Sequence, residues 1–116
     1  MGGFKFRLER VLNVRELQEE QAKFKWAAEE QLAQEERVKL EQLREKARQI
    51  KQFGYEHQEI AVRQAMYAYL EVLSGKIEDQ KQRVQEQEQA AALAKEPWFQ
   101  ARQEAEKVSI LREQQY

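Results

Sequence analysis

The sequence of 116 residues has no cysteine and no threonine, and histidine, proline and aspartate each occur once. Without cysteine, neither a disulfide framework nor a thiolate metal site exists, and a reducing intracellular compartment is expected. A catalytic centre needs a nucleophile, a base and an orienting group brought together. His57, Asp79 and two serines are too few for such a constellation, so we predict no enzyme, no metal and no cofactor.

Long hydrophobic runs are also missing, because no stretch approaches the roughly 18 apolar residues that a membrane span requires. We therefore expect a soluble protein. The formal net charge of -1 conceals 20 basic and 21 acidic residues mixed along the chain. This mixture gives no basic patch of the kind that binds nucleic acid, so we predict no nucleic-acid partner.

The residues that are present favour helix. Charged residues make up 35% of the chain, mean hydropathy is -0.95, and Ala, Leu, Glu, Lys, Arg and Gln dominate. From about residue 5 to 52, apolar residues alternate at spacings of four and three, the repeat of a coiled-coil seam. The predicted seam runs through Leu8, Leu12, Arg15, Ala22, Trp26, Ala33, Leu40, Leu43, Ala47 and Ile50, with Glu19, Glu29 and Glu36 also falling in it.

A break is predicted at Phe53–His57, where Gly54 stands among aromatic and polar residues and His57 is expected in an exposed loop. A second helix is predicted from about 58 to 115. Its expected seam runs through Ile60, Arg63, Tyr67, Leu70, Ser74, Ile77, Lys81, Val84, Glu88 and Ala91. Gly75 is expected inside this helix, and Pro97 is expected to kink it.

Two narrow seams joined by a short link are buried most simply when the helices fold back on each other. We therefore predict an all-α fold, an antiparallel coiled-coil hairpin forming a single domain over residues 1–116. A parallel dimer of straight helices is the main alternative.

Tyr69 and Leu73 lie beside the predicted seam, on a neighbouring face joined by Met66. Two interpretations stay open. These residues widen the hairpin core, as third apolar positions often do in globular helices, or they form an exposed face that binds a partner.

The N-terminal end is rich in basic and aromatic residues, since Lys5, Arg7, Arg10 and Arg15 stand against Glu9. The segment expected alongside is 95–107, where acidic and basic residues balance. The combined end is therefore predicted to be basic.

The opening FKFRLERVLNVRE, the stretch YLEVLSGKIEDQ at 69–80 and Trp98 together resemble the FliJ family. FliJ proteins are coiled-coil components of the bacterial flagellar type III export apparatus. The resemblance implies a two-helix stalk that binds the hexameric export ATPase FliI and the export-gate protein FlhA. Export chaperones are further partners that it suggests. It also implies a cytoplasmic protein that lies peripheral to the inner membrane, at the export apparatus, through its partners only. Family members are usually longer than this chain, and Pro97 departs from the family pattern.

The same resemblance implies site residues. FlhA contact is expected at Tyr69, Leu73, Lys76 and Gln80, and ATPase contact is placed at Phe4, Phe6, Arg7 and Arg10. The alternatives are a generic cytoplasmic coiled-coil scaffold or secretion chaperone, and the equivalent stalk of a virulence type III secretion system.

Overall fold

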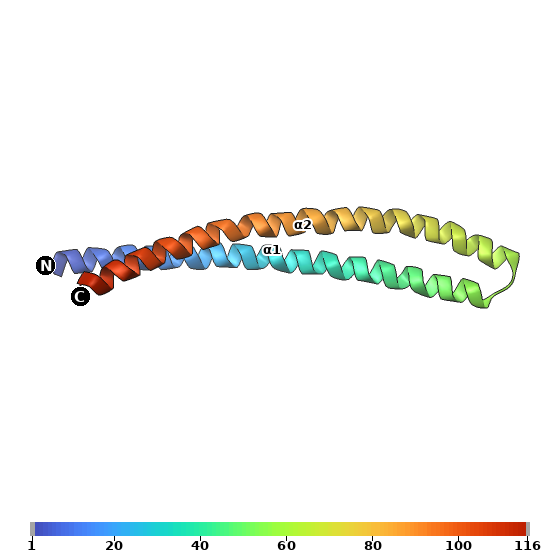
Figure 1. Cartoon of the computed structure of the whole chain (residues 1–116), viewed down its shortest axis with the longest axis horizontal. Helices are drawn as coiled ribbons and strands as arrows, with labels where there is room; N and C mark the ends of the chain where they lie inside the picture. Colours follow the sequence, from blue (N-terminus) through green and yellow to red (C-terminus); the bar gives the residue numbers. More distant parts are fainter. Residues whose placement is uncertain (1, 116) are drawn as a thin grey trace. The chain divides into compact units, whose positions relative to one another are not determined.

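A computed structural model of the chain describes residues 2–115 and consists of two long helices packed together as a hairpin (Figure 1). Helix α1 spans Gly2–Glu56 and helix α2 spans Ile60–Gln115. The predicted all-α hairpin is confirmed. By packing, the chain divides into two compact units: unit 1 comprises Met1–Gln31 with Gln89–Tyr116, and unit 2 comprises Leu32–Glu88.

The connection between the helices lies later than predicted. Helix α1 continues through Gly54 to Glu56, and only residues 57–59 lie outside the helices. His57 is in this connection, as predicted, but it is half-buried, because its Nδ1 lies 2.7 Å from the Phe53 carbonyl oxygen and its ring packs on the Phe53 ring.

The seam of α1 follows the predicted spacing of four and three. Leu12, Ala33 and Leu40 are buried, and the intervening seam positions are half-buried, including Arg15, Glu19, Glu29 and Glu36. Gly54 extends this seam, because it follows Ile50 by four and is itself buried. Gly54, which was predicted to mark the turn, is therefore a small residue in the buried seam of α1.

The seam of α2 differs from the prediction in half of its positions. One predicted row is correct, since Leu70, Ile77, Val84 and Ala91 are buried or half-buried. The other row is shifted by one residue. It contains Met66, Leu73, Gln80, Gln87 and Ala94, whereas Tyr67 is 56% exposed and Ser74, Lys81 and Glu88 are exposed.

Desolvation explains which row is buried. The predicted row would have taken the charges of Lys81 and Glu88 out of water, at a cost of several kcal/mol for each ion unless paired. The observed row carries no charge, and its two glutamines are the only polar residues that it brings to the seam. One of them, Gln80, has a partner on α1.

Gln80 is 6% exposed, and its amide nitrogen donates hydrogen bonds to the Glu36 carbonyl oxygen at 2.9 Å and to Glu36 Oε2 at 2.5 Å. This hydrogen bond is the largest cause of a lowered pKa at Glu36, and Lys39 adds to it. A polar pair inside an apolar seam is satisfied in one alignment only, so it fixes helix register. We assign this role to Glu36 and Gln80 in unit 2.

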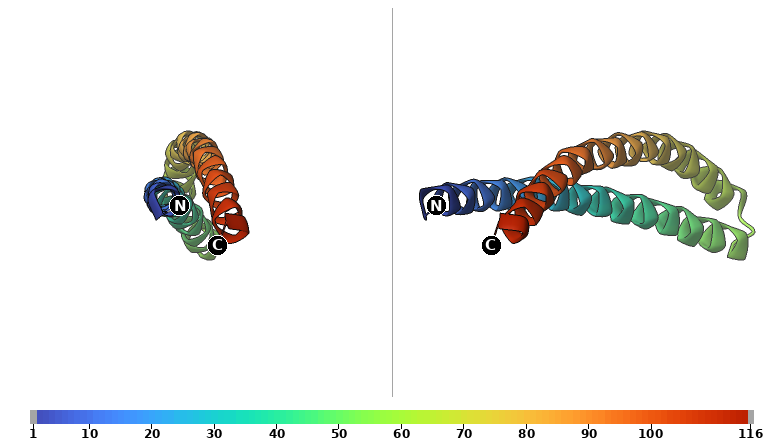
Figure 2. Two further views of the ribbon diagram at one scale, coloured as in Figure 1. Left: turned by 90° about the vertical axis from the view of Figure 1, so that its left-hand side faces the viewer. Right: turned by 60° about the vertical axis from the view of Figure 1, so that its left-hand side comes forward.

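Unit 1 has a seam of small residues interrupted by one large aromatic pair. Ala91, Ala94 and Ala105 are buried, so the helix backbones approach closely there. The C-terminal part of α2 lies obliquely across the N-terminal part of α1 in this unit (Figure 2). Glu9 and Arg112 form an ion pair of 3.8 Å across the two helices.

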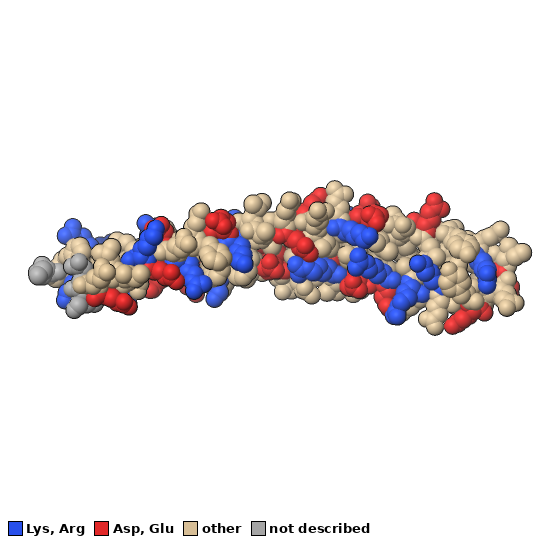
Figure 3. All heavy atoms as spheres, in the orientation of Figure 1, with Lys and Arg blue, Asp and Glu red and all other residues tan. Residues whose placement is uncertain are grey.

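The outer surface carries mixed charges, and lysines and arginines alternate with acidic residues on the face shown in Figure 3. Most ion pairs join residues three or four apart on one helix, such as Glu41 with Arg44 and Glu104 with Lys107. Each pair contributes only a few tenths of a kcal/mol. The seam, rather than these pairs, therefore holds the hairpin together.

Helix α2 passes through Pro97 without interruption, as the prediction of a continuing helix required. Pro97 is exposed, and the carbonyl that loses its hydrogen bond belongs to Leu93, whose side chain is also exposed. That carbonyl is therefore accessible to water, which lowers the cost of proline inside a helix. The predicted kink at Pro97 stays a prediction.

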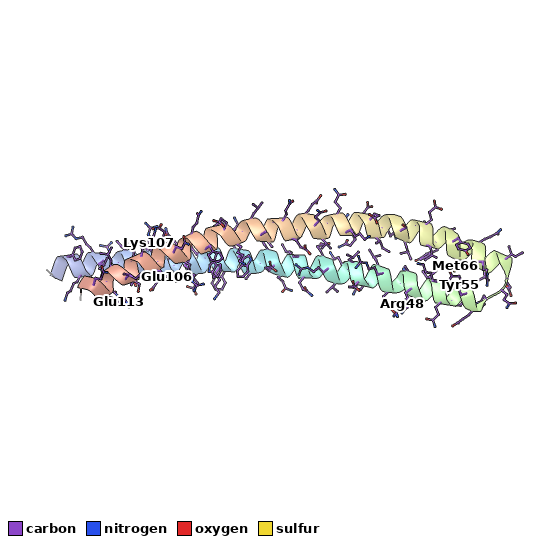
Figure 4. The ribbon with its side chains drawn as sticks, viewed as in Figure 1. Arg48, Tyr55, Met66, Glu106, Lys107 and Glu113 are labelled. Carbon is purple, nitrogen blue, oxygen red and sulfur yellow. The ribbon has the colours of Figure 1, made fainter. Side chains whose placement is uncertain are left out.

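Gly54 is required by the close approach of Met66, which lies against the end of α1 (Figure 4). A Cβ added at Gly54 would overlap Met66 Sδ and stand 2.8 Å from Met66 Cγ. We expect Gly54→Ala to destabilise the hairpin by about 1–3 kcal/mol by overpacking, measured by urea unfolding. In a Met66→Ala background the loss should be much smaller, because the overlapping Sδ and Cγ atoms are removed and only the contact with Cβ, at 3.1 Å, remains. Equal effects in both backgrounds would contradict the steric explanation.

The Glu36 contact predicts a pH dependence of stability. Because the folded-state pKa of Glu36 is lowered, its contribution is present above the ordinary glutamate pKa of about 4.3 and is lost as pH falls below it. Glu36→Gln should therefore flatten the decline of melting temperature in acid. Glu35→Gln, which removes a neighbouring exposed charge without touching Gln80, is the matched control. An unchanged acid decline in Glu36→Gln would show that the contact contributes nothing.

Candidate functional site

The four residues expected to form the FlhA-binding face do not share one exposed surface. Leu73 is 2% exposed and Gln80 is 6% exposed, so both belong to the hairpin seam. Tyr69 is 42% exposed, and Lys76 is also exposed. The interpretation of Leu73 as an outward residue is therefore wrong, and the alternative that it belongs to the core is correct.

The geometry of the repeat explains this division. Leu73 and Gln80 are seven apart and occupy the same row of the seam, whereas Tyr69 and Lys76 are seven apart on the adjoining flank of α2. Residues four apart on a helix lie on nearby rather than identical lines. The exposed part of the expected face is therefore Tyr69 and Lys76, which we call the Tyr69 flank.

Tyr69 interacts with α1 through Lys46, whose Nζ lies 5.5 Å from the centre of the tyrosine ring. A hydrogen bond with Lys46 is the main cause of a lowered pKa at the Tyr69 phenol, and the charges of Lys46 and Lys76 act in the same direction. This cation–π contact spans the two helices, and Lys46 was not singled out from the sequence. The Tyr69 flank is thus positively charged.

An open hollow of about 320 Å³ adjoins the Tyr69 flank in unit 2. Its walls come from both helices and are apolar apart from the phenol: Ile50, Phe53, Val62, Ala65, Met66 and Tyr69. Phe53 lies at the edge of the hollow, and its side chain is 58% exposed. An apolar hollow beside two lysines is suited to an apolar anchor flanked by acidic groups.

The second expected site lies at the start of α1, and all of its residues, Phe4, Phe6, Arg7 and Arg10, are exposed. Phe6 is 65% exposed, and Arg7 Nε donates a hydrogen bond of 3.3 Å to the Gly3 carbonyl oxygen. Arg7 and Arg10 line one open hollow of about 500 Å³ on the outward side of α1, and Phe4 and Phe6 are exposed in the same first turns. No enclosed site is built from them.

The segment alongside this end is not 95–107. The pairing of Glu9 with Arg112 places the last part of α2 against residues 5–15. This segment lies later in α2 than predicted, partly because α1 continues beyond the predicted break. Lys107 and Arg112 there add to the four basic residues of α1, while Glu106 and Glu113 oppose them. Basic residues remain in excess, so the end is basic with a different partner segment.

Comparison with known families gives a match over residues 4–116 to the model described as "FliJ: Flagellar FliJ protein". The chain belongs to the FliJ family. No curated protein and no solved structure matches it. FliJ family membership implies a component of the flagellar export apparatus, and proteins of this family are structural coiled coils that are generally non-enzymatic.

Across residues 2–115 of this FliJ family chain, neither helix contains a segment apolar enough and long enough to cross a membrane. The binding roles of Tyr69, Leu73, Lys76 and Gln80, and of Phe4, Phe6, Arg7 and Arg10, stay predictions.

An aromatic cluster in unit 1 was not predicted, although Trp26 was expected in the seam of α1 and Trp98 was singled out by the family resemblance. The rings of Trp26 and Trp98 stack across the helices with centroids 5.1 Å apart and planes 14° from parallel. Phe99 packs edge-on against Trp98. Lys95 lies 5.6 Å from the Trp26 ring, and Arg102 lies 5.8 Å from the Trp98 ring. The rings therefore meet in a part of the hairpin where the buried residues of α2 are alanines, Ala91, Ala94 and Ala105.

The different burial of Leu73 and Tyr69 has a measurable consequence. Leu73→Ala removes a fully buried side chain and should lower the free energy of unfolding by about 2–5 kcal/mol. Tyr69→Ala, four residues away, should cost less than about 1 kcal/mol, since it loses mainly an exposed cation–π contact. Chemical denaturation of the two single variants gives the comparison. Equal losses would mean that both residues are core residues.

Proposed function

We propose that this FliJ family chain is a non-enzymatic stalk protein of the flagellar type III export ATPase complex. Its N-terminal end contacts the hexameric ATPase FliI, and its Tyr69 flank contacts the export-gate protein FlhA. Export chaperones are further candidate partners. The protein would act in the cytoplasm, peripheral to the inner membrane through these partners. The observation that carries the proposal is a family-matching hairpin whose helix start exposes basic and aromatic residues together.

The ATPase contact is supported by exposure and charge. Phe4 and Phe6 are exposed aromatic side chains, and Arg7 and Arg10 stand beside them without a carboxylate partner among the residues that the structure describes. A two-helix hairpin cannot match six identical subunits with six identical contacts. A few apolar and charged contacts, sensitive to salt, are therefore the expected form of attachment.

The FlhA contact is supported by the apolar hollow and its two lysines. Tyr69 lines the hollow, and Lys46 and Lys76 surround the phenol with positive charge. Leu73 and Gln80 would contribute indirectly, because their burial fixes the rotation of α2 and so the direction in which Tyr69 and Lys76 point.

ATP hydrolysis by the FliI hexamer provides the test. Arg7→Glu with Arg10→Glu should reduce stimulation about tenfold or more, because each reversal replaces an attraction by a repulsion. The matched control is the double reversal Arg44→Glu with Arg48→Glu, which changes the same charge on an exposed part of α1 in unit 2 and should leave stimulation intact. Stimulation that survives the first pair of changes, with helicity unchanged, would refute the N-terminal assignment.

Binding to purified FlhA cytoplasmic domain separates the second contact from the first. Tyr69→Ala and Lys76→Glu should weaken this binding while ATPase stimulation stays at the wild-type level. A generic scaffold or secretion chaperone would show neither activity and would instead bind unfolded export substrates. Activity only with the ATPase of a virulence type III system would identify the homologous stalk of that system.

A further inference from the structure

Residues 98–115, which follow Pro97 in α2, pack against α1 mainly through small side chains. We call this segment the C-terminal arm. From residue 98 to 114, Ala105 is the one residue that is fully buried. The half-buried residues of the same stretch are Trp98, Ala101, Glu104, Val108, Ser109 and Arg112. The equally long stretch before the proline, residues 80–96, has four buried residues. Small side chains remove little apolar surface from water, so the arm gains little free energy from docking.

Pro97 weakens the connection between the C-terminal arm and the rest of α2. Because proline has no backbone N–H, the Leu93 carbonyl lacks the hydrogen bond that a helix would otherwise give it. Both residues are exposed, so water reaches this carbonyl when the helix bends there. Sharp bends in helices occur preferentially at proline. Helix α2 therefore bends at Pro97 at a lower cost than in its uninterrupted parts.

The largest side chain that the C-terminal arm brings to α1 is its first residue. Trp98 stacks on Trp26, with ring centroids 5.1 Å apart. Both indole nitrogens are shielded from solvent, and neither has an acceptor among the residues that the structure describes. A buried donor without an acceptor is unfavourable, and exposure to water removes this penalty. The stack therefore holds the arm on α1 by ring contact, while its unpaired N–H groups favour an open state.

The charged residues of the C-terminal arm stabilise it as a helix more than they bind it to α1. Two ion pairs lie within the arm, and Figure 4 labels one member of each: Arg102 with Glu106 at 3.3 Å, and Glu104 with Lys107 at 3.6 Å. Such pairs persist in a detached helix. Arg112 reaches Glu9 of α1 at 3.8 Å, but both side chains are partly exposed. A solvated pair of this kind contributes little to docking.

We propose that the C-terminal arm is a hinged cover over the N-terminal part of α1. It pivots at Pro97, the tryptophan stack opens, and the arm leaves α1 as one helical body. Because Glu9 pairs with Arg112, Leu12, three residues later in the α1 seam, lies beneath the arm. Leu12 is 1% exposed while the arm is docked, and detachment brings it to solvent together with the half-buried Leu8.

The arm therefore controls access to the apolar side of α1 at this end of unit 1. The inference rests on the packing in unit 1, and it stands whether or not the N-terminal end contacts an ATPase.

Pivoting at Pro97 differs from two other ways of exposing the same residues. Fraying unwinds a helix from its end, so it begins at Gln115 and does not depend on the proline or on the tryptophan stack. Opening of the whole hairpin exposes the seam on both sides of Pro97 equally. Buried positions on the two sides of the proline therefore distinguish these processes.

Thiol labelling measures detachment, because the chain has no cysteine and a single introduced thiol reports one position. Ala105→Cys places the thiol beneath the C-terminal arm. Ala91→Cys is the matched control, since both alanines are buried in α2 of unit 1, at 6% and 1% exposure, on opposite sides of Pro97. We expect Ellman's reagent to label Ala105→Cys at least about tenfold faster than Ala91→Cys under native conditions.

Second changes in the Ala105→Cys chain assign the hinge. Pro97→Ala restores the helix hydrogen bond and should slow labelling at least about fivefold. Gly75→Ala is the matched control, because it also favours helix but lies in unit 2, where an added methyl meets nothing within 4 Å. It should leave the labelling rate unchanged.

The tryptophan stack is tested in the same way. Trp98→Ala should speed labelling of Ala105→Cys at least about threefold, because it removes the ring contact that holds the arm. Leu111→Ala removes a side chain of the arm that is 45% exposed, and it should have no effect. Circular dichroism verifies that each variant remains helical.

Hydrogen exchange of the unmodified chain, followed by mass spectrometry, gives a second measurement that needs no cysteine. Amides of the C-terminal arm should exchange faster than those of residues 80–96, with a step at Pro97 that Pro97→Ala removes.

Three results would overturn the proposal. Equal labelling of Ala105→Cys and Ala91→Cys would show that the seam opens only as a whole. Fast labelling of Ala105→Cys that neither Pro97→Ala nor Trp98→Ala changes, with a gradual rather than stepped exchange profile, would show fraying from the helix end. Slowing by Gly75→Ala as large as that by Pro97→Ala would show that the entire hairpin opens.

Discussion

Burial of one narrow seam on each helix is the interaction on which the rest of this structure depends. Neither α1 nor α2 would be a stable helix in water by itself, because most of the stability of a protein helix comes from packing its apolar face against a partner. The seam residues come at spacings of four and three in both helices, so every turn contributes a little. Surface ion pairs, mostly within one helix, add small increments to this shared burial.

The seam also contains polar residues, and these determine alignment rather than strength. An apolar ladder of leucines and alanines tolerates slippage by one heptad, since the next position offers a similar side chain. The amide of Gln80 has its acceptors at Glu36 alone. In unit 1, the stacked rings of Trp26 and Trp98 also fix the alignment of the helices, because two large rings among alanines meet in one register only. Each unit therefore contains its own contact that sets the register of the two helices.

The sequence was sufficient to predict the hairpin and the seam of α1, because that seam keeps leucine or alanine at most positions. It was insufficient for α2, where Tyr67 and Leu73 offered two competing rows with similar apolar content. The choice between them depended on the charges of Lys81 and Glu88 several turns away, and on a partner for Gln80 that only the folded pair provides. The expected FlhA face inherited this error at Leu73 and Gln80, while Tyr69 and Lys76 were correctly expected at the surface.

Gly54 was misinterpreted for a related reason, since a glycine needed for the close approach of Met66 has the same local appearance as a glycine in a turn.

The tryptophan stack gives this protein an internal optical probe. The chain has two tryptophans, and both belong to the stack in unit 1. Indole fluorescence therefore reports on unit 1 alone, while backbone circular dichroism averages over both units. Coincident melting curves from the two signals would mean that the hairpin unfolds as one cooperative body, and separated curves would reveal a partly zipped intermediate.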